Sequence, residues 1–316
     1  MTAPVTPEVR QAAIEPLDAD PHPPSTGPAA DGWRRLRRNP IAILCMALIT
    51  VLIAVALLAN FIAPYHYDFQ DTQRYMSLPS GPDARHLLGL DDLGQDVLSR
   101  VIYGARISLG VAAVVVGFEI LIGVALGIAA GYYSGWIDLL LMRVTDVMFA
   151  FPGILLAILL TAIVRSGSAA INPVWSLLTL FAALAVVSWP GLARLVRGQA
   201  LALRRKEFVE AARAMGVKDR LILLRHILPN LLSPIIVQVT QDVAAVILAE
   251  ATLSFLGLGV QPPFPSWGRM IEEALPFKES HPLLLIVPSV ALALTVMAFN
   301  FFGDALRDAL DPRLRG

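Results

Sequence analysis

The sequence EFVEAARAMGVKDRLILLRHILPNLLSP, residues 207–234, is a charged stretch enclosed by strongly apolar segments. Its first half repeats apolar side chains at the i, i+3, i+4 and i+7 positions, which lie on one face of an α-helix. These residues are Phe208, Ala211, Ala212 and Met215. The charged Glu207, Glu210 and Arg213 fall largely off that face. The pattern predicts an amphipathic helix at a surface.

Gly216 follows this predicted helix and favours a turn, because glycine readily adopts the left-handed conformation that closes a helix. A second helix is predicted over residues 218–228. Its apolar stripe comprises Leu221, Leu224 and Leu228. We expect Pro229 and Pro234 to break or steer the chain into the next apolar segment. From this pattern alone, the stretch either anchors the protein at a membrane interface or presents a docking surface to a soluble partner.

The rest of the chain has the composition of an integral membrane protein. Of its 316 residues, 56% are hydrophobic and 16% are charged, and the mean hydropathy is +0.65. Soluble domains carry about 25% charged residues, and a bilayer-spanning helix needs about 20 mainly apolar residues. An all-α fold with six transmembrane helices is predicted, over residues 41–63, 107–130, 139–164, 174–196, 231–255 and 283–302.

The distribution of charge predicts the topology. Lys and Arg gather around residues 34–38, 132–143 and 194–225 and in the C-terminal tail, whereas the other loops are relatively acidic. Positive loops stay in the cytoplasm, so we expect both termini on the cytoplasmic side of the membrane. The predicted divisions are a disordered tail (1–32), a basic flank with the first span (33–63), an extracytoplasmic loop (64–106), a five-helix core (107–306) containing the charged segment 204–229, and a cytoplasmic tail (307–316).

Local features refine these predicted spans. A short helix is expected near residues 94–103, and Pro152-Gly153 is expected to kink the third span. Arg143 and Asp146 lie one turn apart and are predicted to pair within their helix. In the second span, glycines recur every fourth residue, a spacing that forms a groove for a close neighbouring helix. They are Gly123, Gly127 and Gly131.

Ionisable side chains within the predicted spans are candidates for a translocation pathway, because a charge in hydrocarbon is costly and often functional. Glu119 lies halfway along the second span. Asp242 lies in the middle of the fifth span, with Gln238 one turn before it, and Glu250 lies nearer the outer end. A carboxylate lining a pore could meet the free amine of a peptide. Pairing with a neighbouring helix or with a second subunit is the structural alternative for each.

The sequence carries no motif for catalysis, metal binding or nucleotide binding. Cys45 is the single cysteine, and no Cys/His cluster occurs. The acids Asp91, Asp92 and Asp96 lack EF-hand spacing, so we expect them to cap a helix or contact a partner protein. The phosphate-binding pattern GxxxxGK[ST] is missing. We therefore expect a protein that is not an enzyme, holds no cofactor or metal, and has no nucleic-acid partner.

A resemblance narrows these alternatives. In type and spacing, the charged stretch resembles the EAA loop of ABC importer permeases: Glu210-Ala211-Ala212, Gly216 and His226-Ile227-Leu228-Pro229. Three further stretches resemble the C-type subunits of the dipeptide, oligopeptide and nickel branch: HLLGLDDLGQDVLSRVIYGAR (86–106), LSFLGLG (253–259) and PPFPSWG (262–268). The resemblance runs from about residue 33 to the C-terminus. It departs from the branch pattern at Leu90 and Gln95, where Thr and Arg are usual.

The resemblance implies a type I ABC importer permease fold in a bacterial inner membrane and a division of labour among subunits. A homologous B-type permease would supply the other half of the pore, one or two ABC ATPase subunits would bind ATP and Mg²⁺, and an extracytoplasmic binding protein would deliver the cargo. The EAA loop would enter an ATPase groove as a coupling helix, with Glu210 pairing with an arginine and Phe208, Ala211 and Met215 filling the groove. The implied cargo is a dipeptide or oligopeptide, with nickel, glutathione and haem as alternatives. A self-contained secondary transporter and a membrane scaffold are the rival classes.

Overall fold

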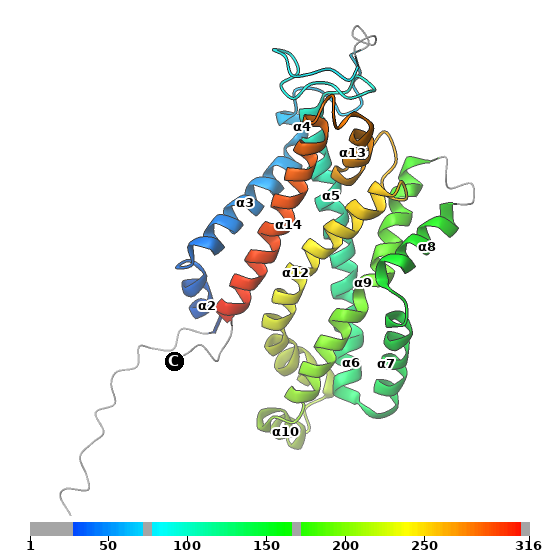
Figure 1. The fold of residues 1–316 in the computed structure, drawn as a ribbon. Helices are drawn as coiled ribbons and strands as arrows, with labels where there is room; N and C mark the ends of the chain where they lie inside the picture. Colours follow the sequence, from blue (N-terminus) through cyan, green and yellow to red (C-terminus); the bar gives the residue numbers. More distant parts are fainter. Residues whose placement is uncertain (1–27, 72–77, 166–171, 311–316) are drawn as a thin grey trace, which may run out of the picture.

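Long helices run side by side through most of the structure, a computed structural model that describes residues 28–71, 78–165 and 172–310 (Figure 1). Within these ranges, β-structure is limited to isolated bridges in the loop before α5. The helices are α2 (Pro28–Leu36), α3 (Pro40–Leu57), α4 (Ala59–Ile62), α5 (Val97–Glu119), α6 (Ala125–Tyr133), α7 (Gly135–Phe149), α8 (Gly153–Arg165), α9 (Pro173–Leu203), α10 (Glu207–Ala214), α11 (Asp219–Ile222), α12 (Leu228–Phe255), α13 (Trp267–Ala274) and α14 (Leu283–Leu310). The predicted all-α class is confirmed.

Five continuous helical stretches of the described chain are long and apolar enough to cross a membrane, and α7 with α8 forms a further pair bent by 82°. The bend lies at Pro152-Gly153, where a kink was predicted. In Figure 1, α7 begins beside the lower end of α6, and α9 begins near the upper end of α8. The bent pair therefore carries the chain from one end of the bundle to the other. Six crossings result if the pair counts as one span, and the orientation of the termini stays a prediction.

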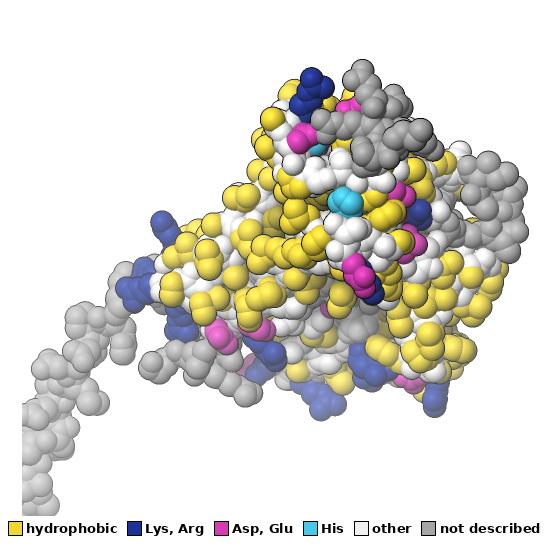
Figure 2. Space-filling view, turned by 45° about the horizontal axis from the view of Figure 1, so that its top comes forward, with side chains coloured by type: hydrophobic (Ala, Val, Ile, Leu, Met, Phe, Trp, Pro, Cys, Tyr) yellow, Lys and Arg dark blue, Asp and Glu magenta, His cyan; other side chains and the backbone are white. Residues whose placement is uncertain are grey.

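The outward faces of the long helices are apolar, as contact with lipid requires. Figure 2 shows hydrophobic side chains over most of the visible face, with Lys and Arg mainly along its lower edge. Exposed apolar side chains occur on helices throughout the bundle, among them Leu44, Leu121, Leu155, Leu248 and Met297. We call the end that carries residues 63–71, residues 78–96 and α13 the loop end, and the end that carries α2, α10 and α11 the charged end.

The second predicted span is longer than expected. α5 begins at Val97 and runs through a π-helical turn, Ile120–Val124, into α6. Asp96 caps its start, since the carboxylate accepts a hydrogen bond from the Ser99 backbone N–H at 2.8 Å. No proline interrupts residues 97–133, so the chain stays helical throughout them. The short helix predicted near residues 94–103 is therefore the first part of this span. The prediction of a loop is therefore wrong for residues 97–106, and helix capping by Asp96 is confirmed.

The glycine groove of the second span receives α9. A Cβ atom on Gly127 would lie 2.6 Å from the Ala193 carbonyl oxygen and 2.7 Å from Val196 Cβ. Gly131 is as tightly enclosed, and Gly123 less so. Carbon atoms pack favourably at about 3.5–4.0 Å, so any side chain at Gly127 would force the two helices apart. The predicted groove is confirmed, and its partner is α9.

The chain does not break at Pro229. Helix α12 continues from α11 through a π-helical turn, Leu223–Ile227, so that Asp219–Phe255 forms one stretch of 37 residues. A proline ring within an α-helix clashes with the carbonyl group four residues earlier. The wider π-helical turn directly before Pro229 accommodates the ring. Of the two predicted effects of Pro229 and Pro234, a break in the helix or a change in its direction, the break is therefore wrong.

Both ends of the described chain lie together at the charged end (Figure 1). Helix α2 packs on the last turns of α14, where Leu36 joins Ala305 and Ala309 in one apolar cluster. This contact stabilises a helix from Pro28, so the predicted disorder is wrong for residues 28–32, and residues 1–27 lie outside the described chain. Helix α14 extends beyond the predicted limit at residue 306 to Leu310.

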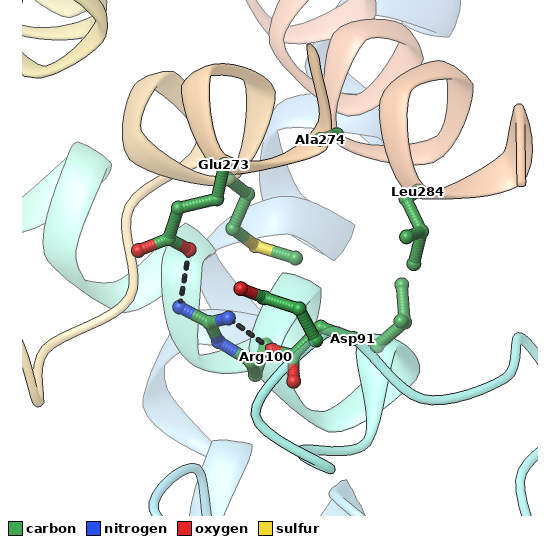
Figure 3. Close-up of a pocket in the computed structure, with 8 residues that line it drawn as sticks. Asp91, Arg100, Glu273, Ala274 and Leu284 are labelled. Carbon is green, nitrogen blue, oxygen red and sulfur yellow. Dashed lines mark hydrogen bonds and ion pairs between the residues drawn. The ribbon is translucent and has the colours of Figure 1, made fainter. Parts of the chain in front are cut away.

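Arg100, near the start of α5, joins two segments at the loop end (Figure 3). Its guanidinium group donates to Asp91 in the loop and to Glu273 Oε2 in α13, the latter at 3.0 Å. The arginine side chain is only 6% exposed. The buried guanidinium group of Arg100 thus holds the loop and α13 against α5.

Asp92 lies beside this bridge. Burial and the neighbouring Asp91 carboxylate raise the pKa of the Asp92 carboxyl group.

Replacing Arg100 with lysine should destabilise the loop end although the charge is kept. One ammonium group cannot bridge Asp91 and Glu273 as the two-nitrogen fork does. Loss of one charge-assisted hydrogen bond costs about 1.5–3 kcal/mol, which thermal unfolding of the purified protein measures. Arg269→Lys is the matched control, because Arg269 is more exposed and bonds the same Glu273 within α13. Equal destabilisation by both variants would contradict the bridging role of Arg100.

Candidate docking surface and acidic cleft

The charged stretch forms the helical corner predicted for it. Helix α10 ends before Gly216, whose φ of +76° is left-handed. The Gly216 N–H donates to the Arg213 carbonyl at 3.0 Å, and the Val217 N–H donates to the Ala212 carbonyl at 3.1 Å. These two bonds form a Schellman motif, which satisfies the last carbonyl groups of a helix and needs a left-handed residue. The turn predicted at Gly216 is confirmed.

The corner has an inner and an outer apolar face. Val209, Ala212 and Ile222 are buried against α6, α9 and α12. Ala212 therefore packs inward with Val209, three residues before it, and the single face predicted for α10 is split. Larger apolar side chains are exposed on the outside: Phe208, Met215, Leu221 and Leu224. We call these four, together with the exposed Glu210 and Ala211, the docking surface.

The later residues of the EAA-like pattern lie beside this surface. His226 is half-buried in the π-helical turn, and its ring centroid lies 6.4 Å from that of Phe208. Leu228 is half-buried at the start of α12, and Pro229 is exposed. The pattern therefore brings Glu210, Gly216 and His226 to one corner of the charged end. Leu228 and Pro229 join that corner to α12.

A polar link holds the corner to the bundle. The Tyr132 hydroxyl, at the end of α6, donates to Asp219 Oδ1 at 2.6 Å. The Arg213 guanidinium group lies over the Tyr132 ring, 5.4 Å from its centroid, a favourable cation–π arrangement. No sequence pattern indicated this link, because Tyr132 and Asp219 belong to elements far apart in the chain. Movement of α10 and α11 is thereby tied to α6.

Arginines of α9 pair with acids of α7 at the same end. Arg197 donates to Asp138, with one bond of 2.7 Å, and Arg194 donates to Asp146 at 2.9 Å. Asp146 therefore bonds across helices, and its predicted pairing with Arg143 is wrong. Each arginine lies on α9, and the acid that it bonds lies on the neighbouring helix α7. Spacing in the sequence shows only which charged residues are close along the same helix, so it could not indicate these pairs. Opposite charges near facing ends of two predicted spans are the signal that could have indicated these bridges.

A cleft of about 200 Å³ lies inside the bundle between α5, α8, α9 and α12. Its ionisable and hydroxyl side chains are Glu119, Asp242 and Ser188, and the rest of the lining is Gly153, alanines and aliphatic residues. Gly153 begins α8 at the 82° bend, and the π-helical turn starts directly after Glu119. Two interruptions of regular helix thus border the cleft, as is common at functional sites in membrane helices.

Two carboxyl groups meet in this cleft. Glu119 is 2% exposed, and the Asp242 carboxyl group lines the same cleft. Gln238 Nε2 donates to Asp242 Oδ1 at 2.9 Å. No backbone N–H, amide or hydroxyl group of the described chain bonds Glu119 Oε2 or Asp242 Oδ2, although both atoms are buried. The structure therefore brings together three of the four predicted pathway residues.

Glu250, the fourth predicted pathway residue, lies apart from the cleft. It is fully buried, and its carboxylate accepts hydrogen bonds from Ser108 at 3.0 Å and from Ser254 at 2.7 Å. The Ser254 hydroxyl in turn accepts a bond from the Val260 backbone N–H. Since both Glu250 oxygens are bonded, this acid joins α12 to α5 rather than facing open space.

Comparison with known proteins agrees with this architecture. Residues 123–316 match the family described as "Binding-protein-dependent transport system inner membrane component", and residues 27–79 match the "N-terminal TM domain of oligopeptide transport permease C". The glutathione transport system permease protein GsiD of Pectobacterium atrosepticum is 46% identical over 290 residues, which cover 91% of this chain and 92% of that protein. GsiD of Escherichia coli O6:K15:H31 is 46% identical over 309 residues, covering 97% and 98%.

Among solved structures, an inward-facing structure of the MetNI methionine ABC transporter aligns with a TM-score of 0.54. The alignment covers 67% of this chain and 96% of that chain at 19% identity, which supports the shared fold alone. Family match, relatives and fold agree with the resemblance noted in the charged stretch. The chain therefore belongs to the binding-protein-dependent transport system inner membrane components, as a C-type permease subunit of an ABC importer.

Proposed function

We propose that this chain forms one half of a pathway that carries short peptides across the inner membrane. The observation that carries this proposal is the 46% identity, over nearly the whole chain, to permeases named for glutathione transport. Glutathione is itself a tripeptide, so the cargo of those relatives falls within the class of short peptides. Nickel and haem are the alternative cargoes within the branch.

The partners proposed for this chain are a homologous B-type permease, one or two ABC ATPase subunits and an extracytoplasmic binding protein. The ATPases bind ATP and Mg²⁺, and this chain supplies the pathway and the contact. The docking surface supports this assignment, since it combines exposed Phe208 and Met215 with the acidic Glu210. Apolar anchors beside a charge suit insertion into a groove that offers an arginine.

Reconstitution tests the proposed function. The complete importer, with both permeases, the ATPases and the binding protein, is placed in proteoliposomes and supplied with a labelled dipeptide, glutathione or Ni²⁺. We expect uptake of one or both peptides that needs ATP and every subunit. Uptake by this chain alone, without ATP, would identify a secondary transporter. ATP-driven uptake of Ni²⁺ but of neither peptide would refute the cargo class.

Replacing Glu210 with lysine should uncouple ATP hydrolysis from uptake. Glu210 is exposed in the first turn of α10, so the substitution reverses a charge without disturbing the buried Val209 and Ala212. Loss of one charge-assisted contact lowers coupled uptake about tenfold or more, while the protein still enters the membrane. Glu207→Lys is the matched control, an equal charge reversal in the same turn. Equal loss in both variants would assign the effect to net charge instead of to Glu210.

A further inference from the structure

The acid pair in the cleft lacks a countercharge. Lys, Arg and His are missing from the lining of the cleft in the described chain. Elsewhere the buried acids are compensated: Asp91 and Glu273 share Arg100, and Glu250 accepts two serine hydroxyl groups. An uncompensated charge in an apolar setting is strongly unfavourable. Glu119 and Asp242 therefore differ from these acids, because the described chain supplies no positive charge beside them.

The geometry of the pair indicates what would complete it. Two ionised carboxylates in one cleft repel each other, and neither can donate a hydrogen bond to the other. Glu119 Oε2 and Asp242 Oδ2 remain as buried acceptors without a protein donor in the described residues. A group that brings both positive charge and hydrogen-bond donors would satisfy these oxygens. A primary ammonium group has three donors and no acceptor.

We propose that Glu119 and Asp242 form a transient binding site for a primary ammonium group of the cargo, such as the free amino end of a peptide. The proposal rests on the proposed function of peptide import. Ser188 adds a hydroxyl acceptor to the same lining, and the other residues of the lining are Gly153, alanines and aliphatic residues. An ammonium group that enters can donate to both carboxylates and balance their negative charge.

The size of the cleft fits an end group rather than a whole cargo. Its volume of about 200 Å³ is below the 300–1,000 Å³, roughly, of pockets that enclose entire drug-sized ligands. Gln238 donates to Asp242 and so fixes the carboxylate on α12, while the Glu119 carboxylate is set on α5 just before its π-helical turn. The two acceptors therefore belong to different helices, and relative motion of α5 and α12 would open or close the site.

Thermal unfolding of the purified importer tests the site directly, with ethylammonium chloride as the probe. A ligand that binds only the folded state raises the unfolding temperature. We expect ethylammonium to raise it, compared with sodium chloride at the same ionic strength, and the rise to vanish in the Glu119→Gln/Asp242→Asn double variant. Asp304→Asn is the matched control, since Asp304 is an exposed acid bonded to Gln241 away from the cleft. No specific rise, or a rise that the double variant retains, would overturn the proposal.

Uptake kinetics give the second readout. Glu119→Gln and Asp242→Asn should each lower the maximal uptake rate of a free-amine peptide about tenfold, the loss expected for one charge-assisted hydrogen bond. The concentration of loaded binding protein that gives half-maximal uptake should not change, since that contact lies outside the cleft. Wild-type rates in both variants would refute the site. If the wild-type importer moves no peptide, the proposed function fails, and the ethylammonium measurement still decides whether the site exists.

Discussion

Replacing Gly216 with leucine should abolish ATP-driven uptake while the protein still reaches the membrane. Gly216 has a φ of +76° within the Schellman motif, and no atom lies within 4 Å of a Cβ placed there. The added Cβ atom therefore meets no neighbour, and a cost of about 1–2 kcal/mol arises from the left-handed backbone. Relief of that strain changes the angle between α10 and α11 and so alters the arrangement of Met215 and Leu221 on the docking surface. Uptake and ATP hydrolysis in proteoliposomes measure the uncoupling.

Two further variants show whether this loss comes from the corner. Gly216→Asn should retain most uptake, because asparagine tolerates the left-handed conformation. Gly135→Leu places the same strain in the turn between α6 and α7, where φ is +62° and the space is also open, and should leave coupling intact. Normal uptake by Gly216→Leu would contradict the coupling role, as would equal loss in the Gly135 variant.

Replacing Gly127 with leucine should prevent stable folding. The new Cβ atom would lie 2.6 Å from the Ala193 carbonyl oxygen and 2.7 Å from Val196 Cβ, contacts that only a shift of α6 against α9 can relieve. Overpacking of a well-packed core costs about 1–3 kcal/mol, and more where the backbone itself must move. We therefore expect a cost of at least about 3 kcal/mol. Size-exclusion chromatography of the detergent extract should show little monodisperse protein.

Gly117→Leu is the matched control for this prediction. Gly117 lies on the same continuous helical stretch, is exposed on the outside of the bundle, and has open space where a Cβ atom would lie, with no other atom within 4 Å. The same substitution there should change stability by less than about 0.5 kcal/mol. If both variants are recovered in normal yield, α6 and α9 do not need close packing. If both are lost, the damage comes from leucine in the span and not from the groove.

The spans and the corner could be predicted because their causes lie within short sequence windows. Runs of apolar residues report the length needed to cross hydrocarbon. A glycine after an amphipathic run marks a helix end, and Gly216 has the left-handed conformation that this requires. The spacing of Gly123, Gly127 and Gly131 likewise specifies a groove by local periodicity alone.

The errors arose where the outcome depends on contacts between distant segments. Pro229 is the one local exception: a proline normally interrupts a helix, but the π-helical turn directly before it accommodates the ring. Glu119, Asp242 and Glu250 are equivalent by sequence, as acids within apolar spans. Only packing between α5 and α12 brings Asp242 to Glu119 and gives Glu250 the Ser108 hydroxyl. Spacing along one helix cannot reveal which acid gains a partner from another.

The unbroken stretch Asp219–Phe255 has a mechanical consequence. Its 37 residues form a beam about 55 Å long, at a rise of about 1.5 Å per residue. Near one end, Glu250 is hydrogen-bonded to Ser108 of α5, and this contact fixes a point about which the helix can tilt. A tilt of about 5° about that point would displace Asp219 by about 4 Å but Asp242 by only about 1 Å, from their distances along the helix. A large movement at the docking surface thus produces only a small change in the position of the Asp242 carboxylate relative to Glu119.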